Sequence, residues 1–139
     1  MGEIRVRIKL ENNNDLAFYE AGIIKKNQLR QEVIDALVDT GAVEMLLPQD
    51  LVEKLGLKLY YKVIVTLADE RKTELWKAGP LWLTVCNRGM ITDCLVGPPG
   101  CEPLLGQVVM EKLDLIPNPR KKTITPNPQS PYLPTLKMK

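Results

Sequence analysis

The chain has 139 residues, of which 45% are apolar and 26% are charged, and its formal net charge is +2. This length predicts one domain that buries its own core, and the composition argues against disorder over the whole chain. The sequence contains no histidine, which excludes Ser-His-Asp and Cys-His catalysis, HExxH zinc sites and imidazole pH switches. Acid–base chemistry would therefore fall to carboxylate, lysine, tyrosine or cysteine side chains.

The cysteine content and the chain start predict a cytoplasmic protein without metal or cofactor. The three cysteines, Cys86, Cys94 and Cys101, show no CxxC spacing, so we expect free thiols in a reducing compartment rather than a zinc site. The first residues run directly into alternating Arg and Ile, which predicts that no signal peptide is present. No apolar stretch approaches 18 residues, so we expect no membrane contact.

The charge is unevenly distributed along the chain. Residues 120–139 contain five basic residues and no acid, so the total of +2 leaves −3 for residues 1–119. A mildly acidic body argues against a nucleic-acid-binding face, and a short basic tail is usually only solvated. We therefore expect no nucleic-acid partner.

The N-terminal part predicts two strands separated by a variable segment. Residues 4–10 alternate apolar and basic side chains, which indicates a half-buried or edge strand. The polar residues 12–15 predict a turn, and residues 16–31 are compatible with either a short helix or a long loop. Residues 32–38 predict a second strand, which ends at the turn sequence 39–42.

A short helix and a hairpin follow. Residues 48–56 predict a capped helix, because a proline lies near its start and a glycine closes it. Residues 62–67 and 73–85 predict two strands around a charged tip at residues 68–72. The sequence therefore predicts an exposed β-hairpin in the middle of the chain.

The C-terminal part predicts short elements separated by proline-rich breaks. Residues 89–96 indicate a third long strand, which leads into the Gly-Pro-Pro-Gly loop at 97–100. Residues 107–113 predict a helix, and residues 115–116 and 123–125 are brief strand candidates. Many short strands with two small helices predict a mainly β domain, closed or sandwich-like, over residues 1–126. Residues 127–139 predict an extended, proline-rich basic tail without a core-forming pattern.

Asp39 is the candidate catalytic residue. It follows the apolar strand residues Ala36-Leu37-Val38 and opens the sequence Asp39-Thr40-Gly41-Ala42. About sixty residues later, a second apolar pair ends in glycine, Leu104-Leu105-Gly106, and a predicted helix follows. A lone Asp-Thr-Gly is also an ordinary turn sequence, so the order of the surrounding parts carries the argument.

With these segments the chain resembles the retropepsin-like aspartic proteases, and more closely their bacterial and cellular branch, over roughly residues 30–126. The resemblance implies a closed β-barrel with a flap hairpin and one or two short helices, and one half-site per chain. It implies that Asp39 is catalytic and that Thr40, Gly41 and Ala42 support it. The residues it implies for substrate binding are Leu37 and Leu104 beside the cleaved bond, and Ala68, Asp69 and Glu70 at the flap tip.

Two positions depart from the viral members of that family. Where those enzymes have an Asp after Asp-Thr-Gly-Ala and an Arg after Leu-Gly, this chain has Val43 and Gln107. Both partners of that ion pair are absent together, so no buried charge is left alone. Glu44 is a candidate replacement for the lost substrate contact.

Metal-free peptide hydrolysis requires two carboxyl groups, one ionised and one protonated. This chain offers one Asp in the required turn, and four strand residues separate Asp35 from Asp39 by roughly 13 Å, too far to share a proton. The partner carboxylate is therefore expected from a second copy, in a homodimer whose two-fold axis passes between the Asp39 pair. The sequence predicts an aspartic endopeptidase acting on peptide or protein substrates, with an optimum on the acid side.

Three other functions are alternatives to this prediction. The first is a catalytically inactive dimer of the same fold that serves as a protein-interaction module. The second is a cysteine-dependent enzyme, which would need Lys or Arg neighbours to lower a thiol pKa. The third is a nucleotide-binding loop at residues 97–100, which fails because it lacks Gly-Lys-Ser/Thr and its prolines offer no amide donors.

Overall fold

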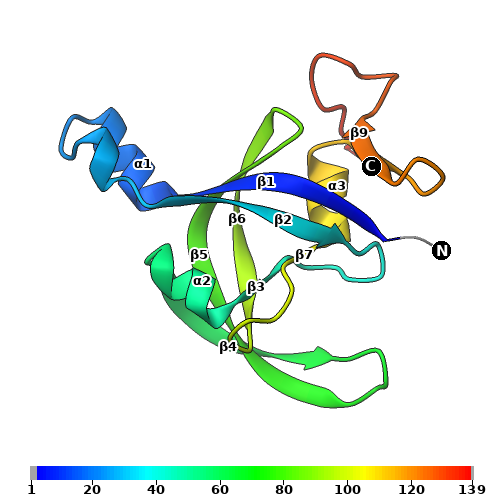
Figure 1. Ribbon diagram of the computed structural model, residues 1–139, viewed down its shortest axis with the longest axis horizontal. Helices are drawn as coiled ribbons and strands as arrows, with labels where there is room; N and C mark the ends of the chain where they lie inside the picture. Colours follow the sequence, from blue (N-terminus) through cyan, green and yellow to red (C-terminus); the bar gives the residue numbers. More distant parts are fainter. Residues whose placement is uncertain (1–2, 139) are drawn as a thin grey trace.

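The computed structural model describes residues 3–138 and is mainly β (Figure 1). The elements in chain order are β1 (Ile4–Asn12), α1 (Asn13–Glu20), the 3-10 turn η1 (Lys26–Gln28), β2 (Gln31–Val38), β3 (Leu46–Pro48), α2 (Gln49–Lys54), β4 (Lys58–Thr66), β5 (Lys72–Val85), β6 (Arg88–Gly97), β7 (Leu104–Leu105), α3 (Gln107–Lys112), β8 (Leu115–Asn118) and β9 (Thr123–Pro126). The predicted strands, hairpin and two short helices are all present. None of these helices is long and apolar enough to cross a membrane.

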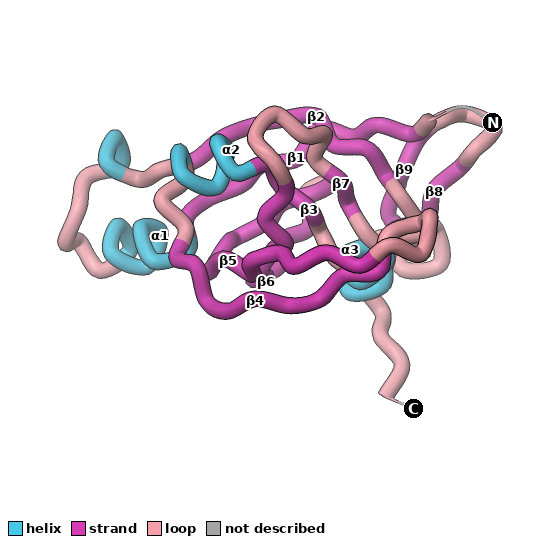
Figure 2. Tube along the Cα trace, turned by 90° about the horizontal axis from the view of Figure 1, so that it is seen from below, coloured by secondary structure: helices cyan, strands magenta, loops and turns pink. Residues whose placement is uncertain are grey.

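Six strands form a closed ring. Their order is β1-β2-β7-β3-β6-β5, and pairing of β1 with β5 closes the ring. β4 lies outside it and pairs only with β5, so the β4–β5 hairpin extends beyond the ring, as Figures 1 and 2 show. β8 and β9 form a separate two-stranded sheet.

The hydrophobic core fills the ring. In β1, Ile4, Ile8 and Leu10 are buried while Arg5 and Lys9 are exposed, which is the expected alternation of a half-buried strand. β1 pairs with β2 along one side and with β5 along the other, so it is not an edge strand. The largest fully buried side chains come from β1, β3, β5 and β7 and from the residues just before β3, after α2 and after α3: Ile8, Leu10, Met45, Leu47, Leu55, Leu81, Leu83, Leu105 and Leu113. Burial of each contributes about 1.5–3 kcal/mol relative to exposure.

The turn predicted at residues 12–15 is wrong, because these residues begin helix α1. The Asn12 side chain caps that helix by accepting a hydrogen bond from the Asp15 N–H at 3.0 Å. Its amide also donates to the Leu55 carbonyl at 2.9 Å, and Asp15 pairs with Arg30 at 2.8 Å. Asn and Asp favour both turns and helix N-termini, and here these distant contacts select the helix.

The segment after β9 is tied back to the body through Asp114. The Asp114 carboxylate accepts hydrogen bonds from the Ser130 hydroxyl (2.5 Å), the Thr135 N–H (3.0 Å) and the Asn127 side-chain amide (3.2 Å). The buried Arg88 guanidinium donates to the carbonyls of Leu113, Asp114 and Ser130. Residues 127–135 are therefore held in a defined path, although no helix or strand forms there. The division into a domain of residues 1–126 and a tail stays a prediction.

Substituting Asp114 with Asn should loosen this segment without unfolding the ring. The Ser130 hydroxyl, with Thr135 and Asn127, holds the pKa of the Asp114 carboxyl below its usual 3.8. The stability that the ionised Asp114 gives to the folded protein is therefore present above pH 3.8. It is lost as the pH falls through the lower pKa that Asp114 has in the folded state. Asn tolerates the positive φ of Asp114 (53°), so we expect the Thr135 amide to exchange hydrogen roughly tenfold faster. Asp69→Asn in the distant hairpin tip is the control and should leave that exchange rate unchanged.

Candidate functional site

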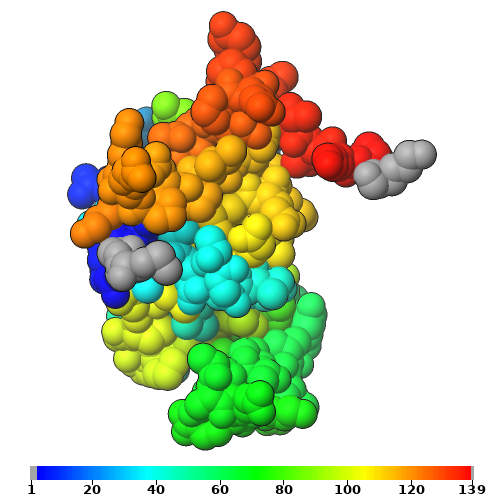
Figure 3. Space-filling view, turned by 90° about the vertical axis from the view of Figure 1, so that its right-hand side faces the viewer, coloured from blue at the N-terminus to red at the C-terminus, as the bar shows by residue number. Residues whose placement is uncertain are grey.

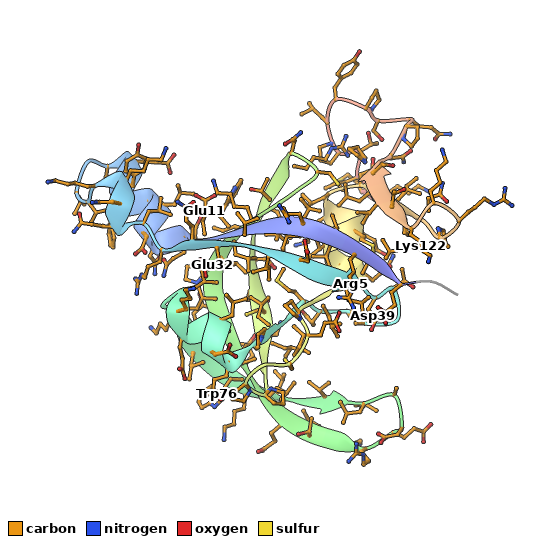
Figure 4. All side chains as sticks on the ribbon, in the orientation of Figure 1. Arg5, Glu11, Glu32, Asp39, Trp76 and Lys122 are labelled. Carbon is orange, nitrogen blue, oxygen red and sulfur yellow. The ribbon has the colours of Figure 1, made fainter. Side chains whose placement is uncertain are left out.

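Asp39 lies directly after β2, in a loop fixed by strand pairing and hydrogen bonds. β2 pairs in parallel with β7, with Val38 opposite Leu105. The Asp39 N–H donates to the Leu105 carbonyl at 3.0 Å, which continues this pairing by one residue. Figure 4 shows Asp39 at the end of β2, with Arg5 of the neighbouring strand nearby. The half-buried Asp39 side chain thus starts from a rigid backbone position.

The residues after Asp39 orient its carboxylate. The Gly41 N–H donates to Asp39 Oδ1 at 3.0 Å, and the Ala42 N–H donates to the Asp39 carbonyl at 3.1 Å. A Cβ at Gly41 would lie 3.3 Å from Asp39 Oδ1, so glycine lets the loop turn closely around that oxygen. Thr40, between them, is exposed. The three predicted support residues therefore form one tight turn around the candidate catalytic group.

Gly106 allows helix α3 to contact the same loop. A Cβ at Gly106 would lie 2.5 Å from the Glu44 carbonyl oxygen and 2.7 Å from that of Val43. The following N–H groups of α3 bind the loop, because Gln107 donates to Ala42 at 2.7 Å and Val108 to Val43 at 3.1 Å. Real Cβ atoms do not approach backbone atoms this closely, so only glycine fits here.

Leu37 and Leu104 lie side by side next to Asp39. They are directly paired between β2 and β7, and both are partly buried. The structure therefore brings together two residues that are 67 positions apart in the sequence and that the family resemblance implies for one pocket.

Glu44 belongs to a cluster of charges that the sequence did not predict. Lys77 of β5 lies 3.1 Å from Glu44 and 3.1 Å from Asp93 of β6, and its side chain is only 11% exposed. Burial opposes the charge on Lys77, but the two carboxylates outweigh it and hold the pKa of Lys77 above its usual value. The available sequence signal was a lone lysine within the apolar strand residues 75–78. Glu44 is therefore bound to the sheet, and it borders a hollow of about 450 Å³ with Tyr60 and Asp93.

Five residues, 67–71, connect β4 to β5 at the tip of the hairpin. The Leu67 N–H donates to the Arg71 carbonyl at 2.7 Å, and the Glu70 N–H donates to the Leu67 carbonyl at 2.9 Å. Ala68, Asp69 and Glu70 make the exposed turn, and Asp69 binds Arg71 within it. Figure 3 shows this hairpin (green) below the segment around Asp39 (cyan), on the same face of the molecule. The predicted tip residues therefore lie on the side of the molecule where Asp39 lies.

Glu70→Gly should stabilise the hairpin tip. Glu70 has φ of +66°, in the left-handed region that a side chain disfavours. Glycine removes this cost, and we expect about 0.5–1 kcal/mol of added stability, measured by thermal unfolding. The control is Glu74→Gly in extended β5, which should lower the melting temperature because glycine weakens a strand interior.

No hydrogen bond joins Asp39 to a second carboxylate within residues 3–138. Asp35, the nearest acid on the same strand, instead pairs with Arg7 of β1 at 3.5 Å. Groups of three or more Cys, Asp or Glu suited to a metal ion are also absent from the part of the chain described. Within the described residues, Asp39 therefore has no carboxylate as a hydrogen-bond partner.

The structure disfavours the cysteine-dependent alternative. Cys86, Cys94 and Cys101 are all unpaired, and burial raises the pKa of each thiol, that of Cys94 to about 12. A raised thiol pKa means little nucleophilic thiolate at neutral pH.

The Gly-Pro-Pro-Gly loop is also unsuited to phosphate. The Gly100 N–H donates to the Asp50 carboxylate at 2.8 Å, and the Cys101 N–H donates to the Pro98 carbonyl at 3.1 Å. An anion approaching this loop would be repelled by the Asp50 carboxylate, which already accepts the hydrogen bond of the Gly100 N–H.

No family model and no curated protein matches this chain.

Proposed function

We propose that this chain is one half of an aspartic endopeptidase with a retropepsin-like closed β-barrel. The observation that carries the proposal is the Asp39 loop, in which a strand-fixed carboxylate is turned by Gly41 and packed against Gly106. A solvated turn aspartate needs neither a parallel partner strand nor a glycine that admits a helix to its loop. Both features fix the backbone around Asp39, as a catalytic group held in a defined geometry requires.

A second copy of the chain supplies the second carboxylate. The exposed Thr40 lies next to Asp39, where its hydroxyl can hydrogen-bond to the opposite loop across a two-fold axis. Two carboxylates held about 3 Å apart share one proton, because both cannot ionise cheaply. The homodimer is thus the active form, and an acid-side optimum follows from the shared proton.

The reaction needs no metal and no covalent intermediate. The ionised Asp39 removes a proton from water while the oxygen of that water attacks the scissile carbonyl carbon. The protonated Asp39 of the other subunit donates to the carbonyl oxygen, which gives a tetrahedral gem-diol. The first Asp39 then passes the proton it took from water to the amide nitrogen as the C–N bond breaks, and the second Asp39 recovers a proton from a gem-diol hydroxyl as the new carboxyl group forms. Both carboxyl groups return to their starting state with one proton between them.

The neighbouring residues bind the substrate in this proposal. Leu37 and Leu104 form the apolar wall beside the cleaved bond, and the hairpin tip at residues 68–70 closes over the peptide and excludes water. Glu44 is held by Lys77, which is itself fixed by a second ion pair to Asp93, so Glu44 forms a fixed wall of the cleft and does not move to meet the substrate. The three unpaired cysteines favour a reducing, cytoplasmic location.

Sedimentation with a statine-type transition-state mimic tests the proposal directly. The mimic should bind between two Asp39 residues, so we expect one molecule per two chains and a shift toward dimer by mass action. Binding of one mimic per chain, or no binding by a protein that is folded by circular dichroism, would contradict a shared site.

A further inference from the structure

The last described residues, 131–138, form an extended arm that leaves the body of the protein. Figure 2 shows this arm extending away from α3 toward the C-terminus. Its apolar side chains are highly exposed: Tyr132 is 92% exposed, Leu133 75%, Leu136 57% and Met138 95%. Four such side chains lie within seven residues and keep most of their surface in water, and contiguous exposed apolar surface marks interaction sites.

The base of the arm is fixed. Ser130 is buried and binds both Asp114 and Arg88, and the Thr135 N–H binds Asp114. Pro131 and Pro134 further restrict the backbone between these anchors. A tethered arm loses less conformational entropy on binding than a free tail does.

A groove of about 740 Å³ lies beside the arm. It runs from Thr40 past Gln107 and Met110 of α3 to Leu115, and Leu136 of the arm forms its other wall. Figure 3 shows the parts that surround it on one face: the Asp39 segment in cyan, α3 in yellow and the arm in red. The groove therefore starts at the residue next to the candidate catalytic group.

We propose that the arm of one subunit binds in this groove on a second copy of the chain, and that each subunit gives and receives an arm. The inference rests on the proposed function, because a two-fold axis between the Asp39 residues brings both Thr40 residues to the axis. The groove that begins at Thr40 on one subunit then faces the same groove on the partner. The arm that lines each groove therefore also faces the other subunit. An isologous contact requires this reciprocity.

Arm exchange would link assembly to the reaction centre. The bound arm would cover Leu136 and Met138 of one subunit while packing against α3 of the other. Helix α3 holds the Asp39 loop through Gln107 and Val108, so arm binding would support the loops that carry both carboxylates.

Charge substitution in the arm tests this inference, in the Asp39→Asn background so that hydrolysis cannot complicate assembly. Leu136→Asp should weaken dimerisation roughly tenfold to a hundredfold in sedimentation equilibrium, because each dimer contains two such contacts. The matched control is Ile23→Asp, which changes a side chain that is 69% exposed in the segment after α1. Figure 1 shows that segment at the other end of the molecule from β9, and the control should keep the dimer affinity.

Disulfide trapping between different copies gives a second measurement. One chain carries Glu111→Cys on α3 and the other carries Lys137→Cys on the arm, both with Cys86 and Cys101 replaced by serine. Only exchange between copies can form the mixed disulfide, which we expect in the mixture on oxidation. Glu20→Cys on α1 replaces Glu111→Cys in the control and should give no mixed product.

The outcomes separate this inference from the proposed function. Equal dimer affinity of the Leu136→Asp and Ile23→Asp proteins, together with no Glu111–Lys137 cross-link, would overturn arm exchange even if hydrolysis depends on Asp39. Hydrolysis that does not depend on Asp39, in a dimer that still forms the cross-link, would overturn the proposed function and leave the exchange in place.

Discussion

Asp39→Asn is expected to abolish peptide hydrolysis while the fold and the dimer are retained. The amide keeps the size of the carboxyl group and can still accept from the Gly41 N–H, but it cannot take a proton from water. Losing acid–base chemistry in both halves of the site should lower turnover by at least roughly 10³-fold. The measurement is cleavage of an unfolded protein between acidic and neutral pH, with circular dichroism to verify the fold.

The control for this substitution is Asp35→Asn. It makes the same chemical change four residues earlier on the same strand, where the side chain is exposed and pairs with Arg7. Its hydrolysis rate should match that of the wild type. If wild type and Asp39→Asn cleave equally, or if neither cleaves, the inactive interaction dimer becomes the better description.

Gly106→Ala is expected to damage both stability and activity. The added Cβ would meet the carbonyl oxygens of Val43 and Glu44 at 2.5–2.7 Å, so either the Asp39 loop or α3 must move. Overpacking of this kind costs about 1–3 kcal/mol. A displacement approaching 1 Å at the carboxylate should also lower turnover roughly 100-fold. Thermal unfolding and the turnover number at saturating substrate measure the two effects.

Gly100→Ala separates the steric effect from the general cost of replacing glycine. Gly100 has φ of +75°, and a Cβ there meets nothing within 4 Å. This variant should lose about 1 kcal/mol from its backbone conformation and keep its activity. A Gly106→Ala protein with unchanged melting temperature and turnover would mean that the loop and α3 do not need this close contact.

The sequence determined the local elements of this protein. Alternation of apolar and basic residues in β1, the apolar run that ends at Asp39, and the charged tip between β4 and β5 each depend on neighbours within a few residues. They predicted β1, β2, the β4–β5 hairpin, β6 and α3 correctly, whereas the short strands β3 and β7 were not predicted. Asp39, Leu37 and Leu104 became candidates through the resemblance to the retropepsin-like proteases. The proposal of a second copy also came from the sequence, because one turn aspartate cannot form a pair by itself.

Only the tertiary structure decided which distant residues meet. The β1–β5 pairing that closes the ring joins Ile8 to Val85, and no local pattern encodes a partner 77 positions away. Lys77 was an unexplained charge in an apolar strand until the fold brought Glu44 and Asp93 to it. Likewise, Asp114 gave no sequence signal, because its hydrogen bonds to Ser130 and Thr135 form only after the chain turns back. A buried charge must find a partner wherever the fold places one, whereas strand alternation is set by the chain itself.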